Sequence, residues 1–127
     1  MQPNCNYTGC ATEYRFATEC TTRGYIVSMP ILDSSPYDAI VDTHQGIYKI
    51  QIKYTNKKPV FPHKSVHVLL EREARAYTLE NVDYFAVYTE YFNGFFIVPN
   101  KGSMKAIRLS AHGKYSDYFN NFAFGSY

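Results

Sequence analysis

The chain has 127 residues, which suits a single domain with one hydrophobic core, and we expect residues 1–127 to form that domain. Hydrophobic residues make up 46% and charged residues 19%, a globular composition that excludes a largely disordered chain. No apolar run approaches the ~20 residues of a membrane-spanning helix, so we expect no membrane partner. Three Cys exclude a disulfide framework, and with no secretory signal at the start we expect a cytoplasmic protein.

The charged residues are segregated along the chain, although the formal net charge is only +2. Residues 49–64 contain five Lys and no acid, and residues 101–114 contain four basic residues and no acid. Residues 71–90 carry five acids against two Arg. This segregation favours basic surfaces that bind a polyanion, but the solvated faces of small domains often show the same pattern.

The first predicted element is a helix over residues 10–23 that ends at Gly24, a helix-terminating glycine. Helical spacing predicts one buried stripe, made of Cys10, Tyr14, Ala17 and Thr21. Glu13 lies beside this stripe, so we expect its carboxylate on or near the side of the helix that faces a sheet. A carboxylate there needs a partner or a metal, unless Glu13 only borders the apolar stripe.

The segments that follow favour strands, then a second helix. Alternating or β-branched runs predict strands over residues 25–28, 37–42, 47–54, 66–70, 84–88 and 95–98. The dipeptide Asn93-Gly94 indicates a hairpin turn between the last two. Residues 114–122 suggest a terminal helix, in which Tyr115, Phe119 and Phe122 would share one face. This order predicts a mixed α/β domain with a central sheet.

A predicted hairpin collects polar residues on one face of that sheet. If its turn is Thr43–Gly46, antiparallel partners have numbers that sum to about 89, and Asp38 lies opposite Gln51. A shift of the turn by one residue would place Asp38 opposite Lys53 instead. Either register puts an acid, an amide and an ammonium on one face of rigid strands. Oxygen ligands of this kind suit Mg²⁺, whereas an amphipathic strand facing water would show the same spacing.

Three sequence words, in this order, resemble the PD-(D/E)XK nuclease superfamily: Arg-Gly-Tyr-Ile-Val-Ser-Met-Pro at 23–30, Ser-Pro-Tyr-Asp at 35–38 and Tyr-Lys-Ile-Gln-Ile-Lys at 48–53. They are most similar to the branch with group I intron homing endonucleases, in which Gln-x-Lys replaces Glu-x-Lys. Residues 83–88 and 96–99 also resemble the later strands of that family. The sequence departs from the general pattern at Gln51, which replaces an acid, and at Tyr37, which separates Pro36 from Asp38.

The resemblance implies a fold and a chemistry. The fold is α/β, a restriction-endonuclease-like core with a mixed central β-sheet flanked by helices. The implied activity is Mg²⁺-dependent hydrolysis of phosphodiester bonds in DNA, with Mn²⁺ as a substitute, by a site-specific endonuclease of homing type. Residue by residue, the metal would be held by Asp38, Gln51 and the main-chain carbonyl of Ile52. Lys53 would be the active-site lysine, and Glu13 the helix acid that holds a metal-bound water.

The expected partner is double-stranded DNA, in the cytoplasm of a bacterium or of a phage-infected host cell. Its phosphates would be contacted by basic residues of the two acid-free segments: Lys49, Lys57, Lys58, Lys64, Lys101 and Lys105. One active site cuts one strand, so we expect a homodimer or homotetramer. Two other functions remain open: a resolvase that cuts Holliday junctions, and a non-catalytic DNA-binding or assembly domain.

Overall fold

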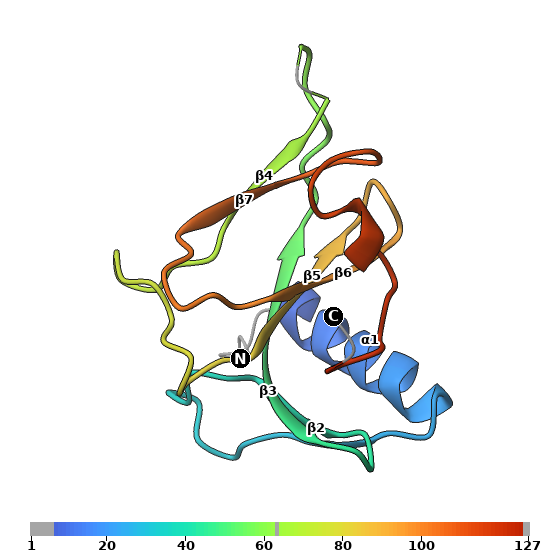
Figure 1. The fold of residues 1–127 in the computed structure, drawn as a ribbon, viewed down its shortest axis with the longest axis vertical. Coiled ribbons are helices and arrows are strands. Elements are labelled where there is room, and N and C mark those ends of the chain that lie inside the picture. Colours follow the sequence, from blue (N-terminus) through green and yellow to red (C-terminus); the bar gives the residue numbers. More distant parts are fainter. Residues whose placement is uncertain (1–6, 63, 126–127) are drawn as a thin grey trace.

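The computed structural model describes residues 7–62 and 64–125, and a five-stranded mixed sheet forms its centre (Figure 1). The strands are β1 (Ile26–Ser28), β2 (Ala39–Asp42), β3 (Ile47–Thr55), β5 (Tyr84–Thr89) and β6 (Gly94–Pro99). They lie in the order β1-β2-β3-β5-β6, with β3 and β5 parallel and the other neighbouring pairs antiparallel. The predicted mixed α/β class is confirmed.

The two faces of the sheet are covered by different kinds of element. The helix α1 (Tyr7–Thr22) packs on one face, while a two-stranded sheet of β4 (Val66–Leu69) and β7 (Ala106–Leu109) packs on the other. In the part of the chain that is described, the second face therefore has a small sheet where the sequence suggested a further helix. No described helix is long and apolar enough to cross a membrane.

Strand β5 is buried along its whole length because it contributes side chains to both cores. Tyr84, Ala86 and Tyr88 join the core beneath α1, whereas Phe85 and Val87 join the core beneath β4 and β7. A strand buried on both faces carries an unbroken run of apolar residues instead of an alternating one, as this segment does.

The buried stripe of α1 differs from the predicted one. Thr12, Phe16 and Cys20 are buried, whereas Tyr14 is 69% exposed. The helix is oriented in this way because Phe16 has no polar atom and is fully buried in the core, whereas the Tyr14 hydroxyl stays at the surface, where water is available to it. The predicted end of the helix is confirmed: Gly24 has a φ of +84°, and the Tyr25 N–H donates to the Cys20 carbonyl at 3.1 Å.

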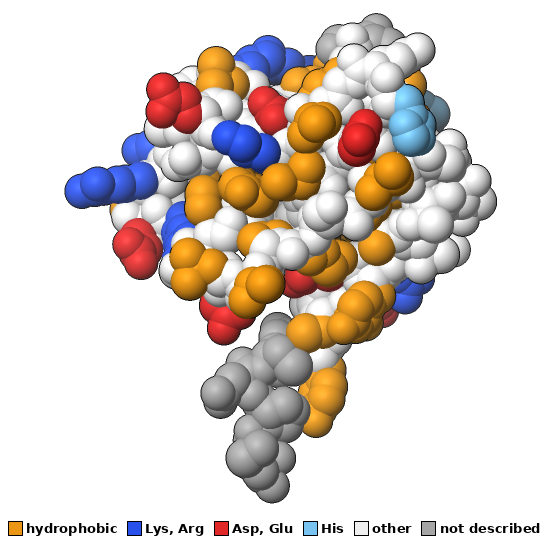
Figure 2. Space-filling model, turned by 90° about the horizontal axis from the view of Figure 1, so that it is seen from below, with side chains coloured by type: hydrophobic (Ala, Val, Ile, Leu, Met, Phe, Trp, Pro, Cys, Tyr) orange, Lys and Arg blue, Asp and Glu red, His pale blue; other side chains and the backbone are white. Residues whose placement is uncertain are grey.

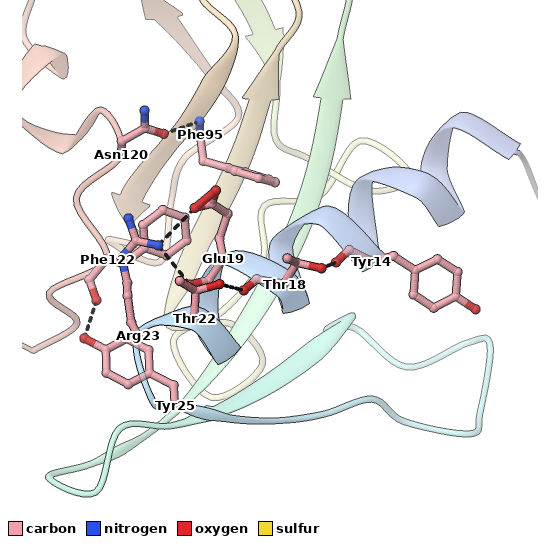
Figure 3. Close-up of polar contacts among 9 residues, drawn as sticks. All are labelled: Tyr14, Thr18, Glu19, Thr22, Arg23, Tyr25, Phe95, Asn120 and Phe122. Atoms are coloured by element: carbon pink, nitrogen blue, oxygen red, sulfur yellow. Dashed lines mark hydrogen bonds and ion pairs between the residues drawn. The ribbon is translucent and has the colours of Figure 1, made fainter.

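The predicted helix over residues 114–122 is wrong. Only a short 3₁₀ turn, η1 (Ser116–Tyr118), forms there, and the chain then runs beside β6 and back across the end of α1 (Figure 3). The Asn120 side chain accepts a hydrogen bond from the Phe95 N–H at 2.9 Å, and the Tyr25 hydroxyl donates to the Phe122 carbonyl at 3.0 Å. Edge pairing with β6 thus competes successfully with helix formation in this segment.

The aromatic side chains of this segment consequently lie on two faces instead of one. Phe122 packs in the core beneath α1, where its ring centroid is 6.0 Å from that of Phe16. The Arg23 guanidinium covers the Phe122 ring at 4.1 Å from its centroid. Phe119 and Tyr115 pack against the opposite core. These aromatics cover the protein's own sheet.

Replacing Phe16 tests the observed orientation of α1. Phe16→Ala should lower the free energy of unfolding by about 3–5 kcal/mol, because it leaves a cavity among the rings of Phe95, Phe122 and Phe124. Tyr14→Ala is the matched control and should change it by less than about 0.5 kcal/mol. Urea denaturation followed by circular dichroism measures both values. Equal losses in the two variants would contradict the orientation described above.

Candidate active site

The register of the β2–β3 hairpin places Asp38 at the mouth of the site. Ala39 pairs with Ile50 and Asp42 with Ile47, so the partner numbers sum to 89. The Thr43 N–H donates to the Gly46 carbonyl at 3.0 Å, which closes the predicted turn. The unshifted register, in which Asp38 comes opposite Gln51, is therefore the observed one.

The Asp38 carboxylate is held by the backbone of β3. Its Oδ2 accepts a hydrogen bond from the Ile52 N–H at 2.8 Å. This N–H is available because β2 begins only at Ala39 and pairs no further along β3. The N–H and C=O of one strand residue point to the same side, so the Ile52 carbonyl also faces the edge of β3 that Asp38 occupies.

Gln51 and Lys53 lie on the sheet face that is turned away from α1. In the parallel pairing they come opposite Phe85 and Val87, both of which face the core beneath β4 and β7. Asp38 shares this face because it lies opposite Gln51. The structure thus brings the three predicted hairpin residues together on one side of the sheet.

The charges of this group interact through a partly buried environment. Burial raises the pKa of the Asp38 carboxyl, although the Ile52 N–H and the positive charges of Lys53 and Arg72 oppose that rise. Burial likewise lowers the pKa of the Lys53 ammonium, and the negative charge of Asp38 opposes that fall. Desolvation favours the neutral form of each group. A ligand that brings an opposite charge next to the group therefore stabilises its charged form.

Glu13 belongs to α1, on the other side of the sheet, yet it lies within the electrostatic field of Asp38. Burial, and after it the negative charge of Asp38, raises the pKa of the Glu13 carboxyl. Among residues 7–62 and 64–125, no strand pairs with β3 on the Asp38 side beyond Ile50. Like charges held near each other favour a cation between or beside them.

The oxygen atoms of this group fit a hard divalent cation. Asp38 offers a carboxylate, Gln51 an amide oxygen and Ile52 a backbone carbonyl, and oxygen is the ligand atom that Mg²⁺ prefers. Among the described residues, no group of three or more His, Cys, Asp or Glu is placed so that it could hold a metal ion. A site with so few anionic ligands leaves room for phosphate oxygens of a substrate, which is how Mg²⁺ is commonly held.

A groove of about 350 Å³ runs along the second half of β3 and includes Ile52 and Lys53 in its lining. Its far wall is β4, and Lys57 and His67 line it together with Lys53. The Lys57 ammonium donates to the His67 carbonyl at 3.4 Å. The described lining residues include no acid, so the groove suits a negatively charged chain that leads to the site.

The other five predicted DNA-contacting lysines are more scattered. Lys49 follows the face of Gln51 and Lys53, but its ammonium donates to the Glu80 carbonyl at 2.7 Å. Lys64 lines a separate depression beside Phe61 and Tyr91. The remaining three are exposed on loops: Lys58, Lys101 and Lys105.

Arg72 and Tyr77 also lie near the site, and neither was predicted from the sequence. The charge of Arg72 reaches both Asp38 and the Tyr77 hydroxyl, and its guanidinium donates to the Ser34 carbonyl at 3.4 Å. Arg72 stands in the most acidic part of the chain, and neither a Gly nor an Asn marks the turn that carries it. No sequence signal therefore singles it out.

Comparisons with known proteins point to one family. A family model described as PD-(D/E)XK endonuclease matches residues 4–120. The structure of a bacterial homing endonuclease is similar, with a TM-score of 0.68 and 20% sequence identity, over 88% of this chain and 83% of that one. Hjc, a Holliday junction resolvase from the archaeal hyperthermophile Archaeoglobus fulgidus, is similar with a TM-score of 0.53 and 12% identity, over 81% and 84%. No curated protein sequence matches this chain.

Proposed function

Because the chain belongs to the PD-(D/E)XK endonuclease family, we propose that it is a Mg²⁺-dependent, site-specific DNA endonuclease of homing type. One observation carries this proposal. Asp38 accepts a hydrogen bond from the backbone of β3 and lies beside Gln51 and Lys53, and Lys53 also lines the basic groove. The similar fold of a bacterial homing endonuclease supports it. We place the enzyme in the cytoplasm of a bacterium or a phage-infected cell.

Each residue of the site has a distinct task in this proposal. Asp38, Gln51 and the Ile52 carbonyl would hold Mg²⁺, with Mn²⁺ as a substitute, and the bound ion would supply Lewis-acid activation of a phosphate oxygen and of water. Lys53 would stabilise the negative charge that develops on the phosphate in the transition state. Glu13 would orient the attacking water from the helix side. Partial burial strengthens the electrostatic action of each group because it lowers the local dielectric constant.

A Holliday-junction resolvase is the second candidate, and the fold similarity to Hjc favours it. A resolvase and a homing enzyme share chemistry and differ in the DNA that they accept. Incubation with linear duplex and with four-way junction DNA, each with and without Mg²⁺, separates the two. A non-catalytic DNA-binding domain would bind both DNAs and cut neither.

Replacing either principal residue should abolish cleavage. We expect Asp38→Ala and Lys53→Ala each to lower the rate by at least about 100-fold, because one loses a metal ligand and the other the stabilising charge. Folding and DNA affinity should be largely retained. Single-turnover cleavage of a labelled duplex, with circular dichroism and a binding titration, measures the three properties.

Glu13→Gln is the graded control for these variants. An amide still hydrogen-bonds to water, so the loss should be smaller than that in Asp38→Ala. Undiminished cleavage by Asp38→Ala or Lys53→Ala would rule out the site as assigned.

The groove makes a separate prediction about DNA affinity. Lys57→Ala should weaken binding equally for all sequences and lower the salt slope by about one, because the contact is to a phosphate. Lys114→Ala removes the same charge outside the candidate contacts and should change neither value. Fluorescence anisotropy over a range of salt concentrations measures both. If Lys57→Ala binds like the unmodified protein, the groove does not carry the DNA backbone.

We also propose a homodimer or homotetramer, since one site cuts one strand and both strands must be cut. The end of the molecule near β1 and the β2–β3 turn supports this by exposing hydrophobic side chains across its centre, with Lys and Arg mostly to one side (Figure 2). There, Ile26 and Ile47 flank Asp42 in one row and are 56% and 67% exposed, and Ile31 is fully exposed. Native mass spectrometry should give a multiple of 14.7 kDa, and a monomer on DNA would contradict the proposal.

A further inference from the structure

A tight hairpin turn sets two arginines side by side. The Arg72 N–H donates to the Arg75 carbonyl at 2.8 Å, and the Arg75 N–H donates to the Arg72 carbonyl at 2.9 Å. Residues that exchange both hydrogen bonds have Cα atoms about 5.5 Å apart and point their side chains to the same face. The turn belongs to the segment of the chain that connects β4 to β5. In Figure 1 it projects from the side of the molecule.

This arrangement is unfavourable for the free protein in two ways. Glu73 and Ala74, at the tip, have φ values of +51° and +63°, a region that residues with a Cβ rarely adopt. Two like charges directly opposite each other also repel. Neither guanidinium belongs to an ion pair among residues 7–62 and 64–125. Costly local geometry of this kind is typical of segments that position a ligand.

The turn lies next to the candidate active site. Arg72 donates to the carbonyl of Ser34, in the loop that leads into Asp38. Burial raises the pKa of the Asp38 carboxyl, and the positive charge of Arg72 is one of those that oppose this rise. That hydrogen bond is 3.4 Å long, at the weak end of the range, so it does not account for the guanidinium. Both arginines are exposed and free to meet a ligand.

We propose that Arg72 and Arg75 form a two-guanidinium clamp that binds phosphodiester groups of the cleaved DNA strand beside Asp38. The inference rests on the proposed function and deepens it by adding a phosphate subsite. Arg72, the nearer to Asp38, binds the reacting phosphate, and Arg75 binds the next one. A planar guanidinium matches the paired oxygens of a phosphate, and the negative charges of the two bound phosphates offset the mutual repulsion of the arginines.

The test compares Arg72→Ala, Arg72→Lys and Arg75→Ala with the unmodified protein. Arg72→Ala should lower the single-turnover cleavage rate by about 100-fold, with Arg72→Lys intermediate, because a point charge replaces part of the fork. Arg75→Ala should mainly weaken duplex binding and lower its salt slope by about one. The melting temperature should be unchanged or higher in Arg72→Ala and Arg75→Ala, because the repulsion is relieved, and unchanged in Arg72→Lys, which keeps the charge.

Arg108→Ala, which removes the same charge from an exposed position on β7, is the matched control and should cleave and bind normally. Unchanged cleavage in Arg72→Ala, or an unchanged salt slope in Arg75→Ala, would overturn the clamp while leaving the nuclease proposal intact. A melting temperature that falls in step with activity would also overturn it, since that marks a structural role.

If the unmodified protein cuts no DNA with Mg²⁺ or Mn²⁺, the nuclease proposal fails. Duplex binding measured without metal then tests the clamp by itself: a lower salt slope in the Arg75→Ala variant supports it, and an unchanged slope overturns it.

Discussion

The late start of β2, at Ala39, is the constraint from which the candidate site follows. Because β2 has four residues and β3 has nine, the second half of β3 keeps one edge open. Asp38 satisfies the Ile52 N–H on that edge with a side-chain oxygen instead of a backbone carbonyl. The same half of β3 lines the basic groove. A longer β2 would stabilise the sheet and eliminate both features.

The site concentrates charges in a place where each of them is partly desolvated. Burial raises the pKa of the Asp38 and Glu13 carboxyls and lowers the pKa of the Lys53 ammonium, so it favours the neutral form of all three. The rest of the sheet offsets this cost through two hydrophobic cores, in which β5 has all six residues buried. Stability thus comes from the strands next to the site, and the site itself keeps its charges available for a ligand.

Sequence reasoning performed well where the signal was local. The turn at Thr43–Gly46, the terminating Gly24 and the alternation of β3 depend on neighbours in the chain, so their consequences for Asp38, Gln51 and Lys53 were predictable. The face of α1 was not, because choosing Phe16 over Tyr14 requires knowing what packs against the helix. The helix predicted over residues 114–122 was wrong for a similar reason. Asn120 accepts a hydrogen bond from Phe95 on β6, and the Phe122 carbonyl accepts one from Tyr25. These long-range contacts outweigh the local helix propensity. Arg72 was missed because a tight turn built from Glu and Ala has no residue signature.

The crossing of residues 119–124 over the end of α1 has a consequence for how the chain acquires its structure. Tyr25 and Phe122 are 97 residues apart, and Phe16 meets Phe122 and Phe124 in the same core. While the ribosome is still translating the middle of the chain, the β2–β3 hairpin has all its residues, but α1 lacks the rings that hold it to the sheet. Contacts of such long sequence separation close late and slowly. The packing of α1, which carries Glu13, thus depends in part on the residues around Phe122, whereas the β2–β3 hairpin that carries the other site residues depends on neighbours in the chain.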